Sequence, residues 1–124
     1  MIVNILKTLS DVNRMRVLNL LKGGELCVCE IEYIMEVNQS NLSRHLKNMT
    51  QVGLITPYRK NKYVYYSINS DFLEKNSFVK EIISRFDEED IFISDSKKLQ
   101  EYKNSDITCD CISQLNLERK LRVK

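Results

Sequence analysis

Four cysteines are the residues of this chain with the clearest capacity for chemistry. They form two Cys-x-Cys pairs, Cys27-Val28-Cys29 and Cys109-Asp110-Cys111. Thiolates without imidazole partners prefer soft acceptors, so the pairs favour As(III), Cd(II) or Pb(II), with Zn(II) as a further option. Two other interpretations stay open: close thiols that oxidise to a disulfide as a redox or sulfur-species switch, and cysteines that pack as small apolar residues.

The geometry of a Cys-x-Cys pair restricts where it can bind an ion. Residues two positions apart do not face each other on a regular helix, so a pair needs irregular backbone to converge. We expect Cys27 and Cys29 to lie near the start of a helix, where such irregularity is available and the helix dipole favours thiolates. This pair is therefore the better candidate for a shared site.

The distribution of charge indicates a polyanionic partner. The net charge of the 124 residues is only +2. Residues 38–69 hold five basic side chains and no acidic one, whereas residues 70–124 hold ten basic and twelve acidic ones. A basic segment within an otherwise balanced protein is typical of nucleic-acid binding.

The elements that must position these residues are mostly helices, because the chain has one proline and three glycines. Residues 2–9 form a predicted short helix, and Ser10 or Asp11 caps a second over residues 12–22 that ends at Gly23-Gly24. A brief extended piece at residues 25–27 precedes a third helix that ends near Glu36. A fourth starts at residues 38–40, buries a stripe of Leu42, Leu46 and Met49, and ends at Gly53.

Beyond Gly53 the pattern changes to period two. Residues 54–59 and 63–69 predict two strands, and Lys60-Asn61-Lys62 predicts their tip. Helical spacing returns at residues 78–86, and residues 95–103 are a further candidate helix. Two helices joined by a short turn and followed by a basic hairpin outline a mostly α winged helix-turn-helix.

In such a fold the fourth helix would enter the major groove and the hairpin would lie along phosphates or reach the minor groove. The side chains that we expect to read base edges lie near the start of this helix: Gln39, Ser40, Asn41, Ser43 and Arg44. Those expected mainly to contact phosphates are Lys47, Arg59, Lys60 and Lys62. The lone histidine, His45, either packs, hydrogen-bonds or touches DNA, and these roles are favoured over metal binding.

Catalysis has little support. The residues six positions after the cysteines are Tyr33, Met35, Leu115 and Leu117, so a phosphatase-type or arsenate-reductase Cys–Arg loop is absent. The acidic run at residues 87–90 is better explained as a solvated helix end than as an acid/base pair. No stretch is apolar enough for a membrane span, and the first residues lack the features of a signal peptide, so we expect a cytoplasmic protein with no membrane partner.

Several segments of the chain resemble the ArsR/SmtB metalloregulatory repressors and occur in the same order and with the same spacing. They are residues 9–18 (LSDVNRMRVL), 25–31 (ELCVCEI), 39–46 (QSNLSRHL), 53–55 (GLI) and 65–68 (YYSI). The resemblance covers about residues 4–70. It implies a winged-helix homodimer, with its first and last helices at the interface, that binds a partly palindromic operator and leaves it when a metal binds. It also implies a thiolate site at Cys27 and Cys29, as in the arsenite-sensing and cadmium/lead-sensing branches.

Three departures from the family pattern concern the ligands. Arsenite sensors of the best-known type have a third Cys where this chain has Glu32. Cadmium/lead sensors draw further Cys from an N-terminal extension that we do not expect here, and the zinc-sensing pattern needs histidines that the last helix lacks. We therefore hypothesise that Cys109 or Cys111, from the same or the opposite protomer, completes the site. Three thiolates would suit As(III) and four would suit Cd(II).

Together these features predict a winged-helix and dimerisation domain over residues 1–93 and a C-terminal extension over residues 94–124. The predicted function is that of a metal(loid)-responsive repressor, with As(III) favoured as the inducer over Cd(II) or Pb(II). The alternatives are a metal-free thiol-redox or persulfide-responsive regulator and, more distantly, a thiol metal carrier that does not bind DNA.

Overall fold

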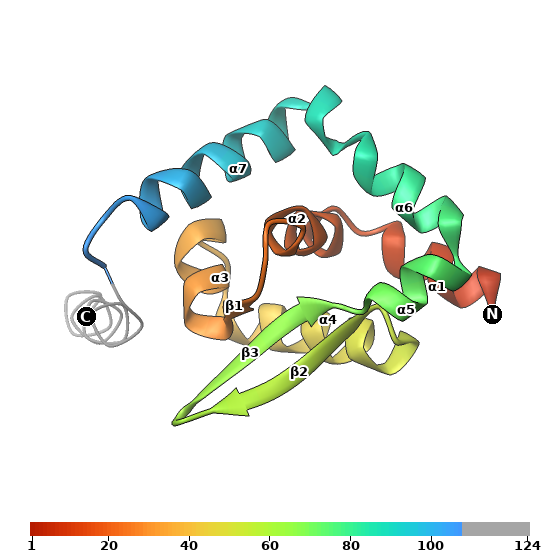
Figure 1. Cartoon of the computed structure of the whole chain (residues 1–124), viewed down its shortest axis with the longest axis horizontal. Coiled ribbons are helices and arrows are strands. Elements are labelled where there is room, and N and C mark those ends of the chain that lie inside the picture. Colours follow the sequence, from red (N-terminus) through yellow and green to blue (C-terminus); the bar gives the residue numbers. More distant parts are fainter. Residues whose placement is uncertain (108–124) are drawn as a thin grey trace.

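The computed structural model describes residues 1–107, which are mostly helical with one small sheet (Figure 1). The elements in chain order are α1 (Ile2–Leu9), α2 (Val12–Leu21), β1 (Leu26–Cys27), α3 (Val28–Met35), α4 (Gln39–Val52), β2 (Ile55–Lys60), β3 (Tyr63–Ile68), α5 (Ser70–Lys75), α6 (Ser77–Ser84), the 3-10 helix η1 (Phe86–Glu88) and α7 (Asp90–Lys103). The predicted order of helices and strands over residues 2–69 is confirmed.

Short polar side chains and residues with positive φ set the ends of the helices. Asp11 accepts hydrogen bonds from the amides of Asn13 and Arg14 and so begins α2, which decides between the two predicted caps. Asn38 caps α4 in the same way, through the amides two and three residues later. The C-cap of α3, Glu36, has a φ of 55°, and that of α4, Gly53, has a φ of 93°. These two left-handed residues turn the chain into α4 and into the hairpin.

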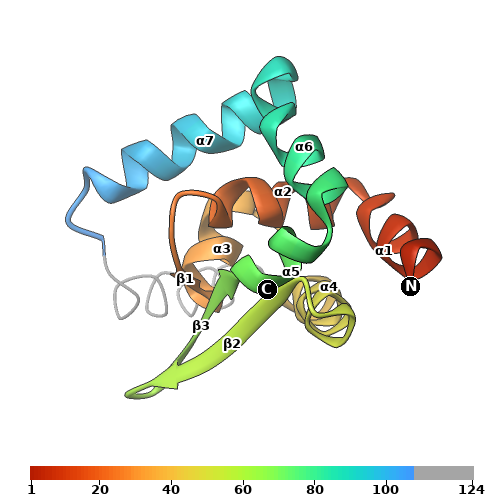
Figure 2. The same cartoon turned by 45° about the vertical axis from the view of Figure 1, so that its right-hand side comes forward.

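The sheet joins the hairpin to the segment that precedes α3. Its strand order is β1-β3-β2, and both pairings are antiparallel. Cys27 pairs with Tyr65, and Tyr65 pairs in turn with Tyr58 on β2. Asn61 has the positive φ of 58° that was expected at the hairpin tip. The hairpin projects from the body of the molecule, on the side away from α6 and α7 (Figures 1 and 2).

The core forms around α2, which the other helices surround (Figure 1). Apolar side chains of α2, α3 and α4 are fully buried there, among them Val17, Leu18, Ile31, Leu42 and Leu46. The buried stripe on α4 thus faces inward as predicted, and the polar face of the helix is left outside.

Past the hairpin the structure differs in part from the expected elements. A short helix, α5, follows the hairpin and is capped by Asn69, whose side chain accepts from the Phe72 amide. Helix α6 ends at Ser84, ahead of the predicted end. The last described helix begins at Asp90, earlier than the expected 95, so position 93, the predicted domain boundary, lies inside α7. None of the described helices is both long and apolar enough to cross a bilayer.

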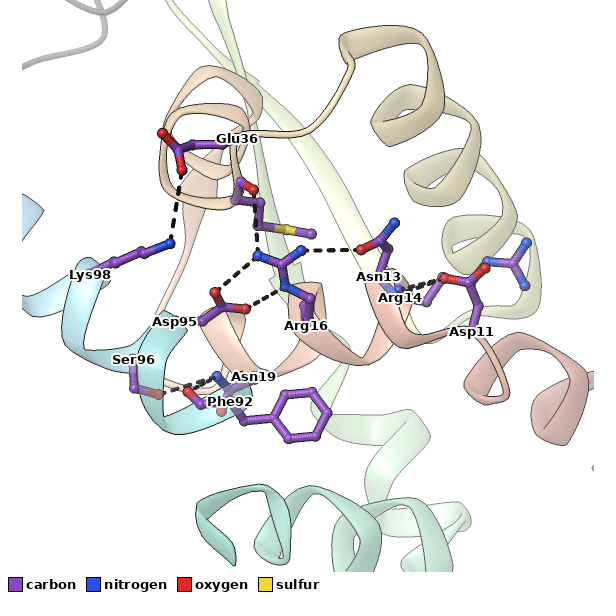
Figure 3. A network of polar contacts seen from close by, with 11 residues as sticks. Asp11, Asn13, Arg14, Arg16, Asn19, Glu36, Phe92, Asp95, Ser96 and Lys98 are labelled. Carbon is purple, nitrogen blue, oxygen red and sulfur yellow. Dashed lines mark hydrogen bonds and ion pairs between the residues drawn. The ribbon is translucent and has the colours of Figure 1, made fainter. Parts of the chain in front are cut away.

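Polar contacts attach α7 to α2 and α3 (Figure 3). The guanidinium of Arg16 on α2 donates to both carboxylate oxygens of Asp95 on α7, over 2.7 and 3.0 Å, and Asp95 is 2% exposed. The same guanidinium donates over 3.4 Å to the carbonyl of Met35, the last residue of α3. The Asn19 side-chain amide donates to the Phe92 carbonyl over 3.0 Å. The position of α7 is therefore defined relative to both α2 and α3.

Candidate nucleic-acid interface and thiol site

The outer face of α4 presents the side chains that were predicted to contact DNA. Gln39, Ser40, Asn41, Ser43, Arg44 and Lys47 are all exposed. Arg44 donates over 3.1 Å to the side-chain oxygen of Asn41, so these two side chains are placed together near the start of the helix. A helix with buried apolar residues on one face and uniformly polar, exposed ones on the other can enter a major groove.

His45 is the exception among the predicted DNA contacts. It is 7% exposed, and its Nδ1 accepts a hydrogen bond from Nε of Arg14 on α2 over 3.1 Å. Burial lowers its pKa, and the Asp11 carboxylate, 4.0 Å from Nε2, opposes that shift. The structure thus supports the packing and hydrogen-bonding role, with α2 as the partner, and we leave His45 out of the proposed DNA contacts.

The basic side chains predicted for the wing lie at the outer end of the hairpin. Arg59, Lys60 and Lys62 are exposed, and the Lys62 ammonium lies 5.5 Å from the centre of the Tyr63 ring. Tyrosines stiffen the hairpin, because the rings of Tyr58 and Tyr65 stack with their centres 5.7 Å apart. These cations project beyond the body of the protein, where they can reach phosphates on either side of a groove.

One contact of the hairpin was not predicted. The Tyr58 hydroxyl donates a hydrogen bond to the carboxylate of Glu25, directly before β1. With the Cys27–Tyr65 backbone pairing, it attaches the wing to the segment that holds the first cysteine pair. Nothing in the sequence identified Glu25 as a partner of the hairpin.

Cys27 and Cys29 converge at the start of α3. Cys27 is the N-cap, with extended φ and ψ of −84° and 162°, and Cys29 stands in the first turn. Because only Cys29 is helical, their sulfurs lie 2.7 Å apart, although residues two positions apart diverge on a regular helix. The predicted convergence at irregular backbone is confirmed. Cys27 is 1% exposed and Cys29 is half-buried.

The thiol of Cys29 is held in its protonated form. Burial raises its pKa to about 11, and the neighbouring Glu30 charge raises it further, against weaker lowering by backbone N–H groups. At neutral pH a ligand that binds Cys29 as thiolate must therefore displace a proton. A soft ion that bonds strongly to sulfur can do so, because its own charge reverses the local electrostatics.

Glu30 links the thiol pair to α7. One carboxylate oxygen accepts the backbone N–H of Cys27 over 2.9 Å, which closes the first turn of α3. The other accepts the hydroxyl of Tyr102 on α7 over 2.5 Å. Tyr102 is 8% exposed and packs against the Tyr33 ring with centres 5.9 Å apart. Sequence reasoning missed both Glu30 and Tyr102, since they are 72 positions apart and match no motif.

The two thiols form part of a site. Within residues 1–107 no three His, Cys, Asp or Glu side chains are arranged to hold an ion. Cys109 and Cys111, which we predict to complete the site, lie outside the described residues. A pair of converging, shielded sulfurs fits a soft, thiophilic ion that takes further thiolates from elsewhere.

Known proteins resemble this chain in fold and in sequence. A family profile described as "Bacterial regulatory protein, arsR family" matches residues 11–56. The transcriptional repressor SdpR of Bacillus subtilis is 34% identical over 71 residues, 57% of this chain and 79% of SdpR. The arsenical resistance operon repressor of Staphylococcus xylosus is 34% identical over 84 residues, 68% of this chain and 81% of that repressor. The chain belongs to the ArsR family.

Further members and solved structures agree with this assignment. CadC, a cadmium resistance transcriptional regulatory protein of Listeria innocua, is 35% identical over 65 residues, which are 52% of this chain and 55% of CadC. Reduced HlyU from Vibrio cholerae superposes with a TM-score of 0.57 at 30% identity, over 66% of this chain and 80% of HlyU. The homodimeric winged helix-turn-helix domain Mb0332 from Mycobacterium bovis gives 0.58 at 25% identity, over 68% and 79%.

The fold and the family together define the general activity. This ArsR-family protein is a winged-helix, DNA-binding transcriptional regulator, not an enzyme. The exposed face of α4 and the basic hairpin are the surfaces that the sequence predicts to contact a duplex. The expected exclusion of catalysis is confirmed by the family.

Proposed function

We propose that this ArsR-family chain is an arsenic-responsive repressor, which leaves its operator when As(III) binds cysteine thiolates. The observation that carries the proposal is the position of Cys27: its sulfur lies 2.7 Å from that of Cys29, and its backbone pairs with the wing strand. A ligand at these thiols therefore acts on a residue of the sheet that holds the basic hairpin. The arsenical resistance repressors among its relatives support the choice of ion.

The chemistry at the thiols is a simple exchange. Arsenous acid and three thiols give an As(III) tris-thiolate and three waters, with no change of oxidation state. We propose that Cys27 and Cys29 of the reduced protein supply two of the thiols and that Cys109 or Cys111, from either protomer, supplies the third. As(III) is soft enough to replace the proton on Cys29 despite its raised pKa of about 11. Four thiolates would suit Cd(II), the alternative that the relative CadC supports.

Ligand binding must be coupled to DNA release through a difference between two states. Strand β1 is only two residues long, so few hydrogen bonds hold Cys27 to β3. Each such bond contributes about 1 kcal/mol, and a strong ion–sulfur bond can outweigh them. We propose that the thiolate geometry around As(III) shifts β1 and so reorients the wing relative to α4.

We further propose that the working protein is a homodimer, assembled through α1 and α7. Apolar side chains are exposed on both helices: Ile2, Val3 and Leu6 on α1, at 48–62%, and Ile91 and Ile93 on α7, at 42–48%. A second copy would bury these surfaces and place two α4 helices on the half-sites of a palindrome. Sedimentation that gives the monomer mass at micromolar concentration would contradict this arrangement.

The cysteine variants test the ligand set. Replacing both Cys109 and Cys111 with Ser should abolish tight As(III) binding and arsenite-induced release, while operator affinity without arsenite stays unchanged. Cys27→Ser should have the same effect. The measurements are arsenite binding under anaerobic conditions and operator anisotropy. Full arsenite affinity and release in the Cys109/Cys111 double variant would show that the C-terminal pair is not part of the site.

A metal-free thiol switch is the second candidate function, and the 2.7 Å separation of the two sulfurs favours it. In that reaction two thiols and hydrogen peroxide would give a disulfide and two waters. The raised pKa of Cys29 argues against it, because the thiolate is the reactive form. Release of DNA by peroxide or persulfide, with no release by any thiophilic ion, would establish this function in place of the first.

A further inference from the structure

The Glu30 carboxylate is the charged group closest in sequence to the thiol pair, yet both of its oxygens are engaged elsewhere. One accepts the Cys27 backbone N–H over 2.9 Å, and the other accepts the Tyr102 hydroxyl over 2.5 Å. The second bond crosses from α3 to α7 and is shielded from water, since Tyr102 is 8% exposed. The carboxylate is thus fixed by one donor on each oxygen.

A carboxylate beside two thiols would normally widen the choice of ion. Zn(II) accepts carboxylate oxygen together with sulfur, whereas As(III) takes thiolates in preference to carboxylates. Within the described residues no third acidic side chain, histidine or cysteine joins the thiols in a metal-binding arrangement. Glu30 is not available as a third ligand, because Cys27 and Tyr102 engage its two oxygens.

We propose that Tyr102 is a positioning residue that determines which ion the thiol site selects. Its hydroxyl occupies the Glu30 oxygen that does not accept the Cys27 N–H, so neither oxygen is left for an ion and the site offers sulfur alone. The inference rests on the proposed function, since it concerns the selectivity of the same thiol site. It assigns to α7 a role in choosing the ligand, in addition to any role in assembly.

Removing the hydroxyl tests this directly. In Tyr102→Phe the ring keeps its packing against Tyr33, but one Glu30 oxygen loses its donor and can turn toward a bound ion. Hydrogen-bond partners just outside a metal site typically change affinity 10–100-fold, so the ratio of Zn(II) to As(III) affinity should rise by about that factor. The affinities are measured on the full, reduced chain by competition with chelators and with a dithiol.

Three further variants distinguish positioning from a merely structural role. Adding Glu30→Gln to Tyr102→Phe removes the freed charge and should return the affinity ratio toward that of the wild type. Adding Glu32→Gln instead should leave the raised ratio in place. Tyr33→Phe, which removes a hydroxyl from the neighbouring ring, is the matched control and should not change the ratio. X-ray absorption at the zinc edge should show an added oxygen neighbour in Tyr102→Phe, with or without Glu32→Gln, but not in the wild type or after Glu30→Gln is added.

The outcomes separate this inference from the proposed function. If the wild type binds As(III) tightly but Tyr102→Phe leaves the ratio unchanged, or weakens both ions equally, then Tyr102 does not set selectivity. Rescue by Glu32→Gln in place of Glu30→Gln would also overturn the assignment. If the wild type binds no thiophilic ion, the proposed function itself fails.

Discussion

Replacing Asp95 with alanine should cost far more stability than any surface substitution on the same side of the molecule. Asp95 is 2% exposed and accepts two hydrogen bonds from Arg16, whose side chain is 14% exposed. In the variant the guanidinium keeps only longer contacts, at 3.3 Å to Asn13 and 3.4 Å to the Met35 carbonyl. Breaking a buried pair in this way costs about 3–5 kcal/mol, because one charge is left uncompensated.

The chain contains a matched control for this prediction. The ammonium of Lys22, at the end of α2, lies 2.8 Å from a carboxylate oxygen of Asp87 in η1, but the Asp87 side chain is 78% exposed. Solvent screens that pair, so Asp87→Ala should cost no more than about 1 kcal/mol. The combined variant Arg16→Met with Asp95→Leu should recover most of the loss, since neither charge is then buried alone.

Urea unfolding followed by circular dichroism measures these free energies, with the protomer concentration held constant because association stabilises the folded state. A loss of about 3–5 kcal/mol is a large part of the 5–15 kcal/mol typical of a domain, so Asp95→Ala should also melt at least about 10 °C lower. Equal costs for Asp95→Ala and Asp87→Ala would refute the argument from burial.

Three further predictions concern protons and phosphates. Because burial raises the pKa of Cys29 to about 11, Cd(II) affinity measured by competition should rise as pH rises from 6 to 8, by up to about tenfold per pH unit for each proton released to solution, whereas arsenite affinity should stay nearly constant because the thiol protons leave as water; Cd(II) affinity independent of pH would contradict this. Replacing Arg59 and Lys60 with Ala should lower the slope of log affinity against log salt by about two for each protomer, and so by about four for the proposed dimer, whereas Lys97→Ala on α7 should leave it unchanged. Burial lowers the pKa of His45, so the unfolded state takes up its proton first and stability should fall as pH drops below 6.5; His45→Gln should flatten that dependence in urea titrations.

Features that depend on neighbouring residues were predictable from the sequence. Asp11 and Asn38 are capping residues directly before amphipathic segments, and Gly53 stands at the end of a helical stripe. The hairpin followed from period two and from Asn61 at its tip. Each of these signals acts within a few residues, where propensity and hydrogen-bonding geometry are decisive.

Features that depend on contacts between distant residues were not predictable from the sequence. The Arg16–Asp95 and Glu30–Tyr102 contacts join positions 79 and 72 apart, and no local pattern pairs them. The inward position of His45 was within reach, because it lies between Leu42 and Leu46 on the edge of the buried stripe. Its partner, Arg14 on α2, became identifiable only when the two helices were seen packed together.

The central claim is that thiophilic ions control DNA binding, and an operator titration tests it most directly. Fluorescence anisotropy of labelled operator DNA is followed with reduced protein under anaerobic conditions, with arsenite, Cd(II), Pb(II) and Zn(II) added in separate experiments. We predict that arsenite releases the DNA at about one equivalent per protomer, because each protomer has one thiolate site. If none of these ions releases the DNA, and peroxide or persulfide does, the thiols form a redox switch and the ligand assignments are wrong.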